Sequence, residues 1–211
     1  MDDLIIAIHA LLGGVALVAG TLALATKKGA RPHVLSGRIF FWAMLVSALL
    51  AISISWLPGH ENRFLFAIGL FTTYLILSGY RALALRGKTY AKLGDWVLSG
   101  SMSLIGIGML VYGVSLLKAS PSAGLIQLVF GSLGLIFGLQ DIRFYRQQDK
   151  AAPATWLRRH LGRMCGGYIA AFTAFLVVNE VLPSLWAFLA PTLVGSFFIA
   201  YWIRRVRLGK R

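Results

Sequence analysis

The feature that most constrains this chain is the alternation of long apolar runs with short basic segments. Of the 21 Lys and Arg residues, only Arg63 and Lys118 lie outside four such segments. Short cytoplasmic loops of membrane proteins collect Lys and Arg, so the pattern indicates an integral membrane protein. The four segments hold Lys27, Lys28, Arg31 and Arg38; Arg81, Arg86, Lys88 and Lys92; Arg143, Arg146, Lys150, Arg158, Arg159 and Arg163; and Arg204, Arg205, Arg207, Lys210 and Arg211.

The apolar runs predict an all-α bundle of seven transmembrane helices in a single domain, residues 1–211. About 20 apolar residues are needed to cross the ~30 Å hydrocarbon core as a helix. Only 13% of the residues are charged, whereas a soluble domain carries roughly 25%. The first run follows the acidic Met1-Asp2-Asp3, so we expect a retained helix and not a signal peptide. The predicted spans are residues 4–26, 39–56, 64–85, 96–117, 123–139, 164–181 and 185–203.

The charges also predict the orientation of the seven helices. With the N-terminus outside and the C-terminus in the cytoplasm, every basic segment lies inside, including the long loop predicted at residues 140–163. Asp2, Asp3, Glu61 and Glu180 then lie outside. The formal net charge of +14 is explained by this topology, so we expect contact with anionic lipid headgroups and no nucleic acid.

A weak internal repeat suggests a plan of three helices, a linker helix and three helices. His33-Val-Leu-Ser-Gly-Arg38 precedes the second apolar run, and His160-Leu-Gly-Arg163 precedes the sixth. The expected halves are residues 1–92 and 123–211 in parallel orientation, with residues 93–118 as the linker. Parallel repeats of this kind occur in some transporters. The alternative is that any two apolar helices look alike.

His9 is the clearest ionisable residue inside a predicted span. Gly13, Ala16 and Gly20 share its helix face at i+4, i+7 and i+11, so we expect His9 to point into the bundle. It is either a proton-relay group, because His titrates near neutral pH, or a neutral side chain hydrogen-bonded to a hydroxyl on a neighbouring helix.

A second polar group falls at the predicted cytoplasmic helix ends. Ionisable groups at such depths are costly, which makes each a functional candidate. If the repeat is present, His33 and His160 flank one central pocket, with Asp95 and Asp141 nearby. Alternatively, the arginines reach the headgroups and Asp95 caps a helix start. The candidates in this group are His33, Arg38, Asp95, Asp141, His160 and Arg163.

Several segments resemble a family of predicted bacterial multipass inner-membrane proteins of unknown function. The segments are His9 to Leu24 with its spaced glycines, Lys28-Gly29, His33 to Arg38, Phe41 to Met44, and His160 to Asn179. The resemblance covers most of the chain. It implies a bacterial inner-membrane location and histidines that belong to the family pattern, and it implies no activity.

Three functions fit these residues. The first is a transporter of a small solute or a proton-coupled transporter, or another ligand-binding membrane protein, which the helix count, the repeat and the inner polar group favour. The second is a haem or metal-binding redox protein, with His33 and His160 as ligands at the inner side and His9 with His60 as an outer pair. A zinc hydrolase that uses His33, His160, Asp95 and Asp141 is a variant of the second.

The third function is an assembly or scaffold protein without small-molecule chemistry, whose basic C-terminal segment binds lipid or a partner. The sequence shows no phosphate-binding loop, dinucleotide fingerprint or compact metal motif. It also shows no nucleophile and base at a known catalytic spacing. The residues therefore name no reaction.

Overall fold

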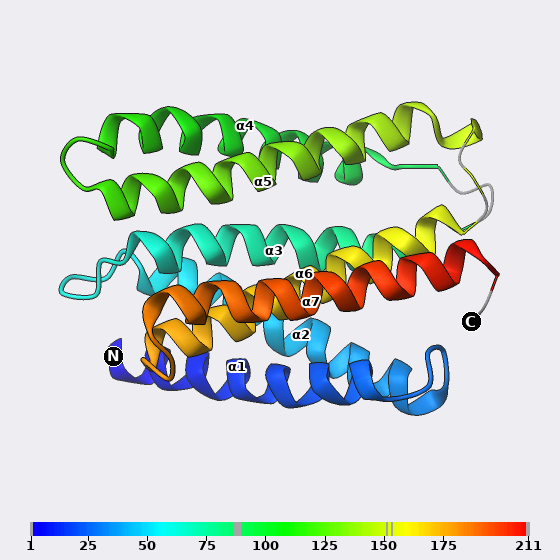
Figure 1. The fold of residues 1–211 in the computed structure, drawn as a ribbon, viewed down its shortest axis with the longest axis horizontal. Coiled ribbons are helices and arrows are strands. Elements are labelled where there is room, and N and C mark those ends of the chain that lie inside the picture. The colour runs from blue at the N-terminus through cyan, green and yellow to red at the C-terminus, as the bar shows by residue number, and fades with distance from the viewer. Residues whose placement is uncertain (1, 87–89, 151, 153, 210–211) are drawn as a thin grey trace.

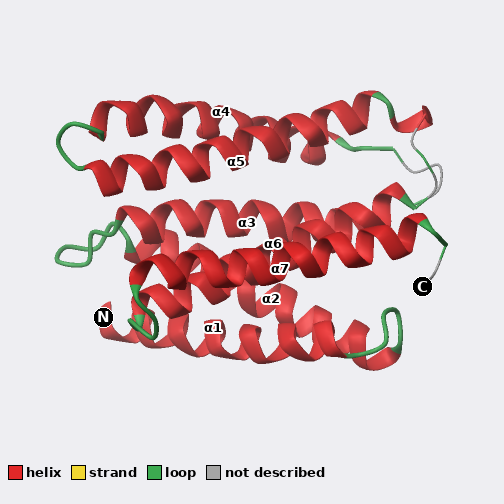
Figure 2. Cartoon of the chain, in the orientation of Figure 1, coloured by secondary structure: helices red, strands yellow, loops and turns green. Residues whose placement is uncertain are grey.

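The computed structural model describes residues 2–86, 90–150, 152 and 154–209, which form long α-helices and one 3₁₀ turn (Figures 1 and 2). Lys88, Lys210 and Arg211 of the basic segments lie outside the described residues. The elements are α1 (Asp2–Ala25), α2 (Arg31–Ile54), α3 (Arg63–Ala84), α4 (Leu93–Leu116), α5 (Pro121–Arg146), the turn η1 (Gln148–Lys150), α6 (Thr155–Val178) and α7 (Ser184–Arg207).

Within this part of the chain, seven helices are long and apolar enough to cross a membrane, as predicted. Each has 22 to 26 residues, and at 1.5 Å per residue such a helix spans roughly 33–39 Å. The hydrocarbon core is ~30 Å thick, so each helix crosses it with little excess. The chain is therefore all-helical and compatible with a multipass membrane protein.

Successive helices run in opposite directions, so all the described basic segments gather at one end of the bundle (Figure 1). We call this the basic end. It holds the α1–α2, α3–α4 and α5–α6 connections and the end of α7, whereas the N-terminus lies at the opposite end. Two connections at the basic end are joined, because Tyr90 donates a 2.6 Å hydrogen bond to Asp149. This bond raises the pKa of Tyr90 above its ordinary value.

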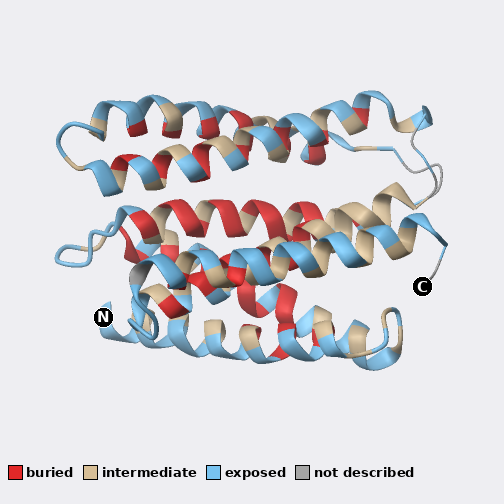
Figure 3. Ribbon diagram, viewed as in Figure 1, coloured by how far each residue is buried: buried red, intermediate tan, exposed pale blue. Residues whose placement is uncertain are grey.

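The helices form two bodies. α4 and α5 pack on each other along their length as an antiparallel hairpin, and they meet the rest of the protein mainly at α3 (Figure 1). The remaining helices form the main body, in which α1 packs on α2, α3 packs on α2 and α6, and α6 packs on α7. α3 carries more buried residues than any other helix, because it packs both on the α4–α5 hairpin and on α2 and α6 of the main body (Figure 3).

Small residues hold the α4–α5 hairpin together. A Cβ added at Gly106 would lie 2.8 Å from the Gly131 carbonyl oxygen, and one added at Gly138 would lie 2.8 Å from the Ser99 carbonyl oxygen. Such contacts require the two backbones to touch, which is the usual driving force for helix association in lipid. The hairpin is therefore a closely packed unit.

The internal repeat is not confirmed. In a repeat that relates α1, α2 and α3 to α5, α6 and α7, α5 would pack on α6 as α1 packs on α2. Among the described residues α5 instead packs mainly on α4 and barely on α6. α4 thus forms a hairpin with α5, and its role as a linker between two halves stays a prediction.

Three helix ends differ from the prediction by seven residues or more, and the others by four or fewer. α5 continues to Arg146 instead of ending at residue 139, and α6 begins at Thr155 instead of residue 164. The segment predicted as a loop at 140–163 is therefore mostly helix. Its charged residues fit into helices at the membrane edge because Arg159 and Arg163 pair with Asp141. α2 begins at Arg31 instead of residue 39, since Pro32 is tolerated in a first helical turn.

Candidate functional site

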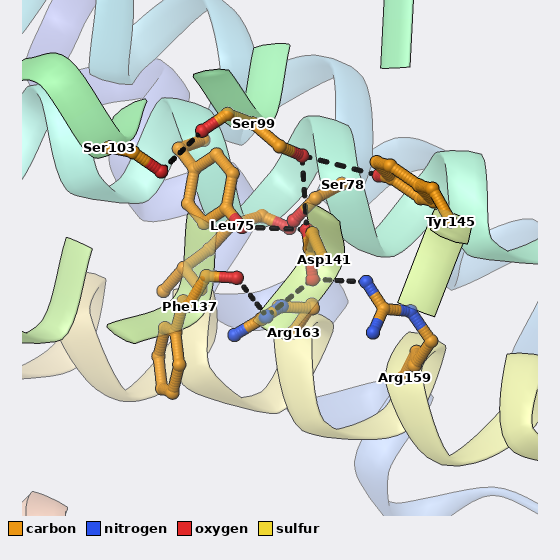
Figure 4. A network of polar contacts seen from close by, with 10 residues as sticks. Leu75, Ser78, Ser99, Ser103, Phe137, Asp141, Tyr145, Arg159 and Arg163 are labelled. Atoms are coloured by element: carbon orange, nitrogen blue, oxygen red, sulfur yellow. Dashed lines mark hydrogen bonds and ion pairs between the residues drawn. The ribbon is translucent and has the colours of Figure 1, made fainter. Parts of the chain in front are cut away.

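Asp141, in the last turns of α5, is fully buried. It is the most buried charged residue of the described chain. Its Oδ2 accepts a 2.6 Å hydrogen bond from the Tyr74 hydroxyl of α3 and a 3.5 Å bond from Ser99 of α4. Its Oδ1 accepts from Arg163 at 2.7 Å and from Arg159, both on α6. We call these five residues the Asp141 cluster (Figure 4).

The two arginines reach Asp141 from one face of α6, because Arg159 and Arg163 are four residues apart. Figure 4 shows both side chains directed at the carboxylate. Arg163 also donates a 3.1 Å bond to the Phe137 carbonyl and lies 4.1 Å from the centre of the Phe137 ring. The Arg159 guanidinium lies 4.3 Å from the Phe144 ring. Aromatic faces and one carboxylate thus hold two cations in place.

The Asp141 cluster carries an excess of positive charge. Two guanidiniums share a single carboxylate, and their side chains are only 15% and 8% exposed for Arg159 and Arg163. A buried charge is stable only when it is paired and hydrogen-bonded. The cluster therefore has one more positive than negative charge, which one further anion would neutralise.

A second ion pair lies next to the cluster. Arg81 at the end of α3 holds Asp95 with two hydrogen bonds, Nε to Oδ1 at 2.6 Å and Nη2 to Oδ2 at 2.7 Å. Asp95 also accepts from the Lys92 backbone N–H at 2.9 Å. Asp95 thus caps the start of α4 through its side chain, as expected, although the N-cap residue is Lys92. Ser99 lies one turn further along α4 and bonds Tyr145 at 3.3 Å.

His33 and His160 lie at the basic end and bond backbone carbonyls instead of the Asp141 cluster. The Nδ1–H of His33 donates to the Ala23 carbonyl at 2.9 Å, and that of His160 donates to the Gly79 carbonyl at 2.9 Å. Asp95 and Asp141 accept hydrogen bonds from arginines instead, and among the described residues neither histidine bonds to them.

His9 connects α1 with α2 near the opposite end. Its Nδ1 lies 2.9 Å from the Ser47 carbonyl and 3.1 Å from the Ser47 hydroxyl, which donates to the His9 carbonyl. The face of α1 that carries His9 points into the bundle, since Ala16 on the same face is fully buried. Arg38 lies apart from all these groups, with an exposed side chain beside Leu12 and Trp42.

No group of three or more His, Cys, Asp or Glu side chains among the described residues is placed to hold a metal ion. The zinc variant with His33, His160, Asp95 and Asp141 therefore has no support in this structure.

The sequence pointed to Asp141 and Arg163 but missed the partners Arg159 and Tyr74. Arg159 was predicted only as a loop charge, although its i, i+4 spacing from Arg163 would have placed both on one face of a continued helix. Tyr74 carries no such signal, because it lies on α3 and meets Asp141 only through the fold.

Comparison of the chain with protein-family models, with curated proteins and with solved structures gives no match.

Proposed function

We propose that the protein transports a small anionic solute together with a proton, and that Asp141 is the coupling carboxylate. The observation that carries the proposal is the fully buried Asp141 shared by Arg159 and Arg163. Ionisable residues at membrane depth are retained where they serve ion or solute pathways. The excess positive charge of the Asp141 cluster selects an anion.

The coupling follows from charge balance. When Asp141 is ionised, it occupies both guanidiniums. When it takes up a proton, Arg159 and Arg163 lose their counter-charge, and a carboxylate or phosphate group then replaces it through charge-assisted hydrogen bonds. The anion and the proton are therefore bound together, which is the requirement for symport.

The arrangement of the helices supplies the moving parts. The Asp141 cluster and the Arg81–Asp95 ion pair join the α4–α5 hairpin to α3 and α6 of the main body. Other contacts across this boundary are apolar, such as Phe71 stacked on Phe137 at 5.9 Å. A closely packed hairpin that rocks against the main body would open one end at a time. Rigid-body rocking around a fixed site is how many transporters alternate access.

We propose that the basic end lies on the cytoplasmic side of a bacterial inner membrane. The gathering of the described basic segments at one end of the bundle supports this orientation by the positive-inside rule. The bacterial origin rests on the family resemblance described above.

Uptake into proteoliposomes tests the proposal. Radiolabelled lactate, succinate and inorganic phosphate are offered outside with an inward proton gradient. We expect the wild type to accumulate at least one of them, and Asp141→Asn to lose the gradient-dependent uptake. Asp149→Asn is the matched control, because Asp149 is an exposed carboxylate of η1. Undiminished uptake by Asp141→Asn, or no uptake of any of these anions by the wild type, would contradict the proposal.

A haem-binding redox protein is the second candidate, and one observation favours it. His33 and His160 each fix the ring by donating Nδ1–H to a backbone carbonyl, which presents Nε2 as the ligand atom in the manner typical of metal-binding histidines. The test is the absorbance spectrum of purified protein expressed with ample haem, before and after dithionite. A Soret band with sharpened visible bands on reduction supports this candidate, and a featureless spectrum removes it.

A further inference from the structure

An apolar groove runs between α6 and α7 on the side that faces α1. Its volume is about 430 Å³, and its walls include Cys165, Phe172 and Leu176 of α6 and Val194 and Phe198 of α7. α7 packs mainly on α6, with Phe188 also against Phe64 of α3, so we infer that the groove is open toward lipid. From Cys165 to Leu176 the groove extends roughly 16 Å along α6, which is about half of the ~30 Å hydrocarbon core.

Lys28 closes the end of the groove nearest the basic end. Its ammonium lies 5.7 Å from the centre of the Phe198 ring, which lines the groove, and 5.1 Å from that of Trp202. It donates hydrogen bonds to the carbonyls of Ala23, Leu24 and Thr26. No carboxylate pairs with it among the described residues, and burial lowers its pKa.

These features define one kind of ligand. The apolar walls match a hydrocarbon chain, and their length matches a chain that reaches the middle of the bilayer. The cation at the groove's end lacks a negative partner and is placed where a lipid headgroup lies. Phosphate is the acidic group that lipids offer at this depth, and each Lys near the surface contributes about 1 kcal/mol to its attraction.

We propose that the groove between α6 and α7 is a binding site for one anionic phospholipid, with an acyl chain in the groove and the headgroup phosphate on Lys28. The site is distinct from the Asp141 cluster and does not depend on the transport proposal. A bound lipid would fill the open side of α7 and attach this helix to α1.

Native mass spectrometry of detergent-purified, delipidated protein tests the proposal by counting bound lipids. The probes are dioleoyl phosphatidylglycerol, dioleoyl phosphatidylcholine and oleate, offered separately. We expect one phosphatidylglycerol to be retained by the wild type under conditions that remove phosphatidylcholine and oleate. Lys28→Gln should lower its occupancy about fivefold, the loss expected for one lysine–phosphate attraction of about 1 kcal/mol.

Two controls separate a built site from the general attraction of a basic protein for acidic lipid. Lys27→Gln removes the same charge from the exposed neighbour and should leave the retained phosphatidylglycerol unchanged. Ala190→Trp fills the groove and should release the lipid, whereas Leu193→Trp adds the same ring on an exposed face of α7 outside the groove and should not.

Three results would overturn the proposal. The first is equal retention of phosphatidylglycerol and phosphatidylcholine by the wild type. The second is equal loss in the Lys28→Gln and Lys27→Gln proteins, which would assign the effect to net charge. The third is retention of oleate in place of the phospholipid, which would make the ligand a fatty acid.

Discussion

Asp141 shows how one buried carboxylate can organise several helices. It draws hydrogen bonds from α3, α4 and α6 while it sits on α5, so four helices depend on its charge. Replacing one partner of a buried charge leaves the others uncompensated, which usually costs more than the pair itself contributes. The residues of the Asp141 cluster should therefore be more sensitive to small changes than any apolar position around them.

Tyr74→Phe tests this sensitivity with the loss of a single oxygen atom. Because the Tyr74 hydroxyl donates to a charged group at 2.6 Å, we expect the free energy of unfolding to fall by about 1.5–3 kcal/mol. The measurement is a denaturant titration in micelles followed by circular dichroism. Tyr112→Phe is the control, because that exposed tyrosine of α4 should tolerate the change with little loss. Equal stability of the two variants would show that the hydroxyl of Tyr74 contributes nothing.

At this scale the sequence identified the buried charged residues, but it did not identify the residues that they contact. Asp95, Asp141 and Arg163 stood out because charges are rare near apolar runs. The sequence grouped both carboxylates with His33 and His160, yet each accepts from an arginine. Helix rotation decides such pairings, and a single sequence of apolar helices fixes rotation poorly, because lipid-facing and buried faces are both apolar.

At the scale of elements, the α4–α5 hairpin has the most specific packing in the bundle. Gly106 and Gly138 bring its backbones into contact with those of Gly131 and Ser99. Small residues on both helices thus form the seam of the hairpin. The spacing of glycines on two adjacent spans is thus a usable signal for helix pairing.

Gly106→Ala should destabilise the hairpin although it adds only one methyl group. The new Cβ would lie 2.8 Å from the Gly131 oxygen and from the Leu135 nitrogen, and overpacking of this kind costs typically 1–3 kcal/mol. Gly108→Ala provides a matched control on the same helix, because nothing lies within 4 Å of its added Cβ. We expect the apparent melting temperature in detergent to fall for Gly106→Ala alone. Equal melting temperatures would mean that the seam can relax.

The ends of α5 and α6 show where hydropathy stops being informative. The apolar run ends near residue 139, but α5 continues to Arg146 because Asp141 finds cationic partners on α6. A window that rejects charged residues cannot anticipate this compensation, since the partners lie on another helix. The same pairing explains why α6 begins in the segment that the sequence assigned to a loop.

At the scale of the whole molecule, the described basic segments gather at one end while the acidic N-terminus lies at the other (Figure 1). The positive-inside rule then predicts a cytoplasmic C-terminus. A C-terminal green fluorescent protein fusion expressed in a bacterium should fluoresce, and a C-terminal alkaline phosphatase fusion should be inactive. An active phosphatase fusion would reverse the orientation and place the Asp141 cluster at the outer side.

The proposed transport cycle requires the α4–α5 hairpin to move against the main body when the Asp141 cluster loses its charge. Paired spin labels at Val97 of α4 and Val34 of α2 report this motion, because both residues are exposed near the basic end. The labels are attached through Val97→Cys and Val34→Cys in a Cys165→Ser background, in lipid nanodiscs. The measurement is the distance distribution by pulsed electron paramagnetic resonance, with Asp141 intact and with Asp141→Asn.

With Asp141 intact we expect one narrow distance, because two arginines and Tyr74 hold the hairpin in place. With Asp141→Asn we expect the distribution to shift to longer distances as the basic end opens. Identical distributions in the two proteins, each shown to be folded by circular dichroism, would contradict the account, since the Asp141 cluster would then not control the relation of the two bodies.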